Sequence, residues 1–149
     1  MRKTVITAIT VSVLLLAATA VSAGERFAQE AQYGFGQELF LDLNYRLAEN
    51  VFKYVVIARP ESALAGDATF MEAEAQYNGG RYMQALKSYI GIIEKYPATK
   101  DKYIKELYYR IAECYYQLKG PENSIKYINL LLASYKGSYL DRDAYLLLG

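Results

Sequence analysis

Residues 73–97 read AEAQYNGGRYMQALKSYIGIIEKYP, and this stretch decides the fold. From Leu86 to Ile93 the apolar residues recur at spacings of three and four, which is typical of an amphipathic helix. The run Asn78-Gly79-Gly80 marks a turn before this helix. Pro97 ends it, because proline cannot continue the helical hydrogen-bond ladder. The stretch therefore predicts two helices joined by a tight turn.

The same pattern recurs at offsets of 37 and 39 residues along the chain. Three columns of aligned residues carry the repeat: small residues at Gly36, Ala73 and Ala112, small residues at Ala48, Ala85 and Ser124, and large residues at Phe52, Tyr89 and Ile128. The repeat units are about residues 29–62, 66–99 and 105–138, with a partial fourth unit at 142–149. No segment alternates between apolar and polar residues with a period of two, so we expect no strand.

A period of this length with two helices per unit predicts a solenoid. A single hairpin is too small to bury its own apolar face, but stacked neighbours share one continuous core. We therefore expect an all-α fold, a right-handed superhelical α-solenoid of antiparallel helix hairpins with about three repeats and a partial fourth. The solenoid would occupy residues 24–149.

Residues 1–23 have the features of an export signal. A short basic start, Arg2-Lys3, precedes an apolar run from Val5 to Ala20, and Val21-Ser22-Ala23 places small residues at a cleavage site. The alternative is an uncleaved anchor that holds the chain in a membrane. We expect cleavage after Ala23 and a periplasmic location, with no transmembrane segment after cleavage.

The composition excludes several classes of function. The chain has 17 Lys and Arg against 16 Asp and Glu, so it lacks the basic surplus that nucleic-acid binding needs. The absence of His removes His-based catalysis and nearly every zinc site. We expect no catalytic residue, no cofactor and no metal. The single cysteine, Cys114, is interpreted as a small buried helix residue, with an intermolecular disulfide as the alternative.

The run Ala73…Tyr77…Gly80-Arg81-Tyr82…Ala85-Leu86…Tyr89…Pro97 resembles a tetratricopeptide repeat. The longer spacing resembles repeats in bacterial envelope proteins, such as the outer-membrane assembly-factor lipoprotein and the periplasmic partner of the Tol-Pal system. The sequence departs from the pattern at Glu72, whose column holds Phe35 and Ile111 elsewhere, and at Lys136, which replaces the proline of the third unit. The resemblance implies a scaffold for protein–protein interaction in the cell envelope.

In such superhelices the first helix of each unit lines the concave face, which is the expected binding groove. Three columns project there, and they give nine candidate partner-binding residues: Tyr33, Phe70 and Tyr109; Gln37, Glu74 and Glu113; and Phe40, Tyr77 and Tyr116. The acidic column would favour a ligand that carries Lys or Arg, and tyrosine combines a large contact area with a polar tip. The alternative is that these aromatic residues only pack in the core.

Leu146-Leu147-Leu148-Gly149 falls inside the first helix of the fourth unit, without the polar capping helix that solenoids use. The sequence therefore predicts a fragment of a longer repeat protein, or self-association through this end. Two other functions stay open at this stage, a glycan- or peptidoglycan-binding module and the non-catalytic arm of a larger envelope enzyme.

Overall fold

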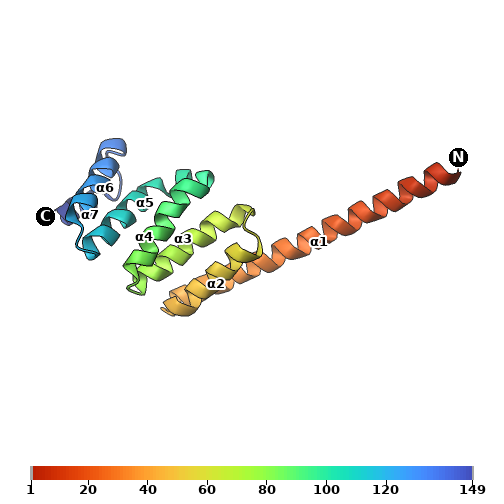
Figure 1. The fold of residues 1–149 in the computed structure, drawn as a ribbon, viewed down its shortest axis with the longest axis horizontal. Helices are drawn as coiled ribbons and strands as arrows, with labels where there is room; N and C mark the ends of the chain where they lie inside the picture. The colour runs from red at the N-terminus through yellow and green to blue at the C-terminus, as the bar shows by residue number, and fades with distance from the viewer. Residues whose placement is uncertain (1, 149) are drawn as a thin grey trace.

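The computed structural model describes the backbone of residues 2–148 and the side chains of residues 20–148. Within residues 2–148 the chain forms seven α-helices and no strand. The helices are α1 (Arg2–Leu41), α2 (Tyr45–Ala58), α3 (Ala63–Asn78), α4 (Tyr82–Lys95), α5 (Pro97–Gln117), α6 (Pro121–Ser134) and α7 (Asp141–Leu148). They follow one another in a single stack, and α1 extends out of it toward the amino terminus (Figure 1).

Each helix packs mainly on the helix before it and the helix after it. The pairs α1–α2, α3–α4 and α5–α6 are the three predicted hairpins, and α7 is the first helix of the partial fourth unit. The predicted all-α solenoid of stacked hairpins is therefore confirmed.

The turns inside the three hairpins have the same backbone geometry. Leu43, Gly80 and Lys119 occupy equivalent positions and have φ values of 61°, 75° and 58°. In each turn the next residue donates its backbone N–H to the carbonyl five positions earlier, as in Arg81 to Gln76 at 2.8 Å. This left-handed geometry is a common end for a helix, and it favours glycine because glycine lacks a Cβ atom.

Pro60 follows the end of a helix, whereas Pro97 begins one. The second helix α2 ends at Ala58, just before Pro60, as predicted. Helix α4 ends at Lys95, but Pro97 is already the first residue of α5, where the sequence led us to expect a connection up to residue 105. Proline fits this position because its φ suits a helix and the first turn needs no N–H donor from it. A bend at Tyr103, with φ −119° and ψ 19°, divides α5 into two parts.

The predicted small and large columns form the core. The large residues Phe52, Tyr89 and Ile128 are fully buried, as are the small residues Ala48, Ala73, Ala85 and Ala112. At Gly36 a Cβ atom would lie 2.7 Å from Cε1 of Phe52, so only glycine fits there without movement of the ring. The small columns are thus places where the helices pack closely.

Cys114 is fully buried in the same core. Burial raises the pKa of its thiol to about 12, with Glu113 adding to the shift and Arg110 opposing it. A buried, protonated thiol is a poor nucleophile, so the interpretation as a small packing residue is confirmed.

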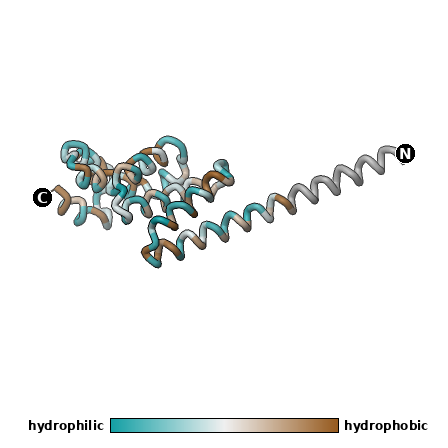
Figure 2. Tube along the Cα trace, turned by 60° about the horizontal axis from the view of Figure 1, so that its bottom comes forward, coloured by the Kyte–Doolittle hydropathy of each residue, from teal (hydrophilic) through white to brown (hydrophobic). Residues whose placement is uncertain are grey.

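Among the described residues, no helix combines the length and the apolar character that crossing a membrane requires. The predicted export signal, residues 1–23, has most of its side chains outside the described part of the chain. At the other end of the chain, Figure 2 shows hydrophobic residues near the carboxyl terminus. Tyr145 and Leu146 are 62% and 70% exposed there.

Candidate functional site

The first helices of neighbouring units line the inner side of the stack. Helix α1 contacts α3, and α3 contacts α5, whereas no comparable contact joins α2 with α4 or α4 with α6 in the described chain. The first helices therefore converge and the second helices diverge. The three predicted columns lie on first helices, so we define the inner surface of α1, α3, α5 and α7 as the groove.

The first aromatic column packs against its neighbours. The ring of Tyr33 lies 5.5 Å from that of Phe52, centroid to centroid. Phe70 meets the ring of Tyr89 edge-on and stacks on Tyr103 at 4.3 Å with an interplanar angle of 9°. Burial raises the pKa of Tyr33 to about 12, and the charge of Asp67 adds to the shift. Tyr33 and Phe70 are therefore partly buried and pack against the core.

The second aromatic column mostly closes the hairpins. Phe40 packs edge-on against Tyr45, and Tyr77 packs in the same way against Tyr82, both with centroids 5.3 Å apart. The third unit has Pro121 at the position of these partner tyrosines. Tyr116 consequently lacks the aromatic partner of its column and is 56% exposed.

Two members of the acidic column, Glu74 and Glu113, form ion pairs with the same arginine, Arg110. Glu74 is 8% exposed, and it accepts hydrogen bonds from Arg110 Nε and Nη2, both at 2.9 Å, and from the hydroxyl of Tyr89 at 2.6 Å. Arg110 Nη1 also donates to Glu113 at 2.8 Å. Gln37, the third member of the column, is exposed. The carboxylate of Glu74 is therefore already hydrogen-bonded within the protein. Its negative charge is neutralised by Arg110 and is not available to a ligand.

Arg110 also contacts an aromatic side chain of the second column, that of Tyr77. Its guanidinium carbon lies 4.9 Å from the centroid of the Tyr77 ring, in a cation–π geometry. The pKa of Tyr77 is raised, first by burial and then by the charge of Glu113. Arg110 was not among the predicted site residues, because its column holds Gly34 and Met71 in the other units and so gives no repeated signal.

The groove opens into a cleft of about 390 Å³ near the carboxyl-terminal end of the chain. It is lined by Glu106, Tyr109, Arg110, Glu113, Tyr139, Leu140 and Asp143. Burial raises the pKa of the Tyr109 hydroxyl to about 12, and Glu113 adds to the shift. The hydroxyl of Tyr139 donates to Glu106. Two of the predicted residues, Tyr109 and Glu113, meet in this cleft.

The cleft has more acidic than basic groups. Its carboxylates are those of Glu106, Glu113 and Asp143, and Arg110 is the basic residue in its lining. Arg110 is already shared between Glu74 and Glu113. The cleft therefore presents negative charge beside a tyrosine ring, an arrangement that suits a cationic side chain with an apolar stem.

The described residues hold no cluster of three or more acidic or thiol side chains that could bind a metal ion. What the groove combines is partly open aromatic surface, a saturated ion-pair network and a negatively charged cleft.

Comparison with known proteins agrees with the repeat architecture. The tetratricopeptide repeat family matches residues 67–99 and 106–138, which are the second and third units. No curated protein matches the sequence. The second and third units are thus similar to tetratricopeptide repeats, a family whose members generally act as non-catalytic scaffolds for protein–protein interaction.

Proposed function

We propose that the chain is an exported scaffold of the bacterial cell envelope that binds a protein partner in its groove. The observation that carries this proposal is the cleft at Glu106, Tyr109 and Asp143, where the ring of a tyrosine lies beside carboxylates that are not paired with Arg110. Tetratricopeptide repeats in two units support the protein-binding part of the proposal.

The position of the first packed residue supports export. Residues 20–28 are exposed, and a Cβ atom at Gly24 would meet no heavy atom within 4 Å. Among the residues whose side chains the structure describes, the first buried one is Gln29, which is 5% exposed. Cleavage after Ala23 would therefore leave all the buried residues of this part of the chain in the mature protein. An uncleaved signal that anchors the same solenoid to the membrane is the alternative location.

The partner segment should carry Lys or Arg. The charge available to it comes from Asp143 and from Glu106 rather than from Glu74, which Arg110 neutralises. The ring of Tyr109 lines the same cleft and can cover the apolar stem of a basic side chain. The groove walls at Tyr33 and Phe70 would hold neighbouring apolar residues of the partner.

Charge reversal in the cleft tests the binding. The mature chain would serve as bait in an extract of the cell envelope, and the double variant Asp143→Lys, Glu106→Lys should lose its captured partner. The matched control is Glu94→Lys with Glu122→Lys, which makes the same change in charge at exposed positions of the second helices. Equal capture by the cleft variant and the wild type would remove the cleft from the proposal.

Fractionation of cells and amino-terminal sequencing test the location. We expect the chain in the periplasmic fraction with Gly24 as its first residue. If the chain keeps residues 1–23 and sediments with membranes, the alternative of an uncleaved signal that anchors the solenoid is correct. A chain found in the cytoplasm would contradict both locations.

A further inference from the structure

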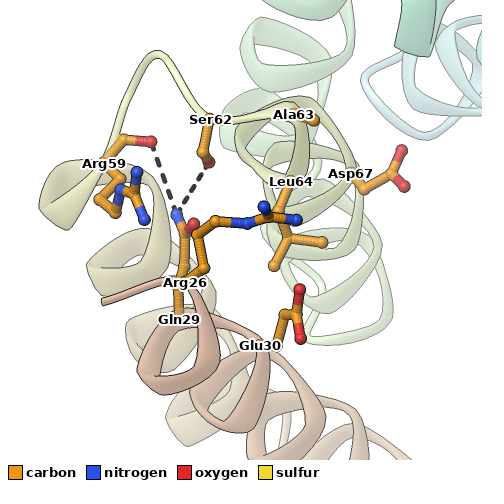
Figure 3. A pocket seen from close by; sticks show the side chains of 8 residues that line it. All are labelled: Arg26, Gln29, Glu30, Arg59, Ser62, Ala63, Leu64 and Asp67. Atoms are coloured by element: carbon orange, nitrogen blue, oxygen red, sulfur yellow. Dashed lines mark hydrogen bonds between the residues drawn. The ribbon is translucent and has the colours of Figure 1, made fainter. Parts of the chain in front are cut away.

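A second cavity lies at the opposite end of the stack, beside α1, the α2–α3 loop and the start of α3. Its volume is about 400 Å³, and its lining includes two arginines, Arg26 and Arg59. Figure 3 shows these two side chains on either side of Gln29. The tetratricopeptide pattern assigns no role to either arginine, and the proposed function does not use them.

The loop over this cavity is held without help from the arginines. Gln29 Nε2 donates to the carbonyl of Val55 at 3.0 Å and to the hydroxyl of Ser62 at 2.9 Å. Figure 3 shows the second of these bonds and a longer one, of 3.5 Å, to the carbonyl of Arg59. Gln29 thus joins α1 to α2 and to the α2–α3 loop without using either guanidinium group.

The start of α3 leaves its first N–H groups available. Ser62 precedes the helix, but its side chain makes no capping hydrogen bond to the helix. The residues that follow, Ala63 and Leu64, line the cavity. The first N–H groups of a helix have no partner within the helix and carry partial positive charge.

Arg59 supplies the observation that points to a ligand. Its Nη1 nitrogen is buried and has no hydrogen-bond partner in the described part of the chain. A buried donor without an acceptor is costly, and a guanidinium group recognises carboxylate and phosphate oxygens especially well.

The balance of charge in the cavity is positive. Asp67 lines it, but its carboxylate is paired with Lys102 at 2.8 Å. Glu30 is then the remaining acid against Arg26 and Arg59. An incoming anion would therefore meet two guanidinium groups and one competing carboxylate.

We propose that this cavity binds an oxyanion group, a carboxylate or a phosphate, through Arg59, Arg26 and the first N–H groups of α3. Arg59 provides the buried donor, Arg26 the second charge, and the helix start the backbone donors. The site shares no lining residue with the cleft at Glu106 and Asp143, so the two can be tested separately.

Nuclear magnetic resonance of the wild-type full chain tests the site directly. Inorganic phosphate and acetate are added in separate titrations, which distinguish a tetrahedral from a planar ligand. We expect saturable shifts of the backbone amide signals of Ala63 and Leu64 and of the Arg59 side chain with at least one anion. Shifts with neither anion, or shifts confined to exposed lysines of the second helices such as Lys87 and Lys126, would overturn the proposal.

A matched pair of variants adds a second test. Arg59→Gln should weaken binding of the effective anion by at least about tenfold, because it removes the buried charge. Arg142→Gln removes an exposed arginine near the other end and should leave the affinity unchanged. Circular dichroism checks that Arg59→Gln is folded, and the wild-type titration decides the question if it is not. Equal affinity of a folded Arg59→Gln variant and the wild type would also overturn the proposal.

Discussion

Arg110 of α5 forms two hydrogen bonds with the carboxylate of Glu74 in α3, and both donor–acceptor distances are 2.9 Å. The two residues belong to different repeat units, so this ion pair joins the units across the groove. The Glu74 side chain is 10% exposed and that of Arg110 29%, which places the pair well inside the surface.

Removal of one partner should cost more than removal of both. Arg110→Leu leaves Glu74 buried without its cation, and we expect a loss of about 3 kcal/mol in the free energy of unfolding. The double variant Arg110→Leu, Glu74→Leu removes the unpaired charge and should recover a large part of that loss. Urea unfolding of the four proteins of this cycle gives the coupling, and additive losses would contradict a pair that acts as a unit.

Two neighbouring glycines give a test of the helix packing. Gly36→Ala places a methyl group 2.7 Å from Phe52 and should destabilise the chain by about 1–3 kcal/mol. Gly34→Ala is the control, because its Cβ atom would meet no heavy atom within 4 Å. It should stabilise α1 by up to about 1 kcal/mol through the better helix propensity of alanine. Thermal unfolding measures both changes, and equal effects would show that Gly36 is not a contact point.

The left-handed turn position predicts stabilising substitutions. Leu43 and Lys119 have positive φ values where the equivalent residue of the second hairpin is Gly80. Leu43→Gly and Lys119→Gly should each stabilise the chain by about 0.5–1 kcal/mol, because the left-handed conformation strains a residue with a Cβ atom. The reverse change, Gly80→Ala, should destabilise by a similar amount. Chemical unfolding tests the set, and a loss of stability in both glycine variants would contradict the shared geometry.

Glu72 predicts a dependence of stability on pH. Burial raises its pKa from 4.5 to about 7, with Lys53 opposing the shift and Glu49 adding to it. The folded chain therefore binds this proton more tightly than the unfolded chain does. The stabilisation is complete below the unfolded pKa and is lost as the pH rises through the folded pKa. We expect a decline of about 1–2 kcal/mol in the free energy of unfolding between about pH 5 and about pH 8.

The variant Glu72→Gln should remove this decline. Its amide cannot ionise, so its stability relative to wild type should be greater at the higher pH. Glu94→Gln, at an exposed position of α4, is the control and should leave the pH dependence as it is. An unchanged slope in Glu72→Gln would show that another group is responsible.

The sequence predicted the features that repeat. Gly36, Ala73 and Ala112 share a column, and so do Phe52, Tyr89 and Ile128, so the helices and their closest contacts could be read from aligned positions. A repeated column records a packing need that every unit has in common. This is why the hairpins and the buried small residues were predicted. The burial of Cys114 was predicted on another ground, because a free cysteine packs like a small apolar residue.

The features that occur once could not be predicted in this way. Arg110 has no equivalent in the other units. It nevertheless forms ion pairs with Glu74 and Glu113, two of the predicted binding residues. The contact of Tyr139 with Glu106 depends on the path of the α6–α7 connection. Both contacts follow from tertiary geometry rather than from spacing along the chain, so the sequence predicted the charge of the groove but not which carboxylates remain free.

A photoreactive cross-linking residue at two positions tests the central claim that the groove is the surface that binds the partner. One position is Tyr109, which lines the cleft, and the other is Tyr54, which is 56% exposed on the second helix α2. Illumination in living cells should link a protein partner to the chain at position 109 and not at position 54. A partner linked only at position 54 would contradict the account.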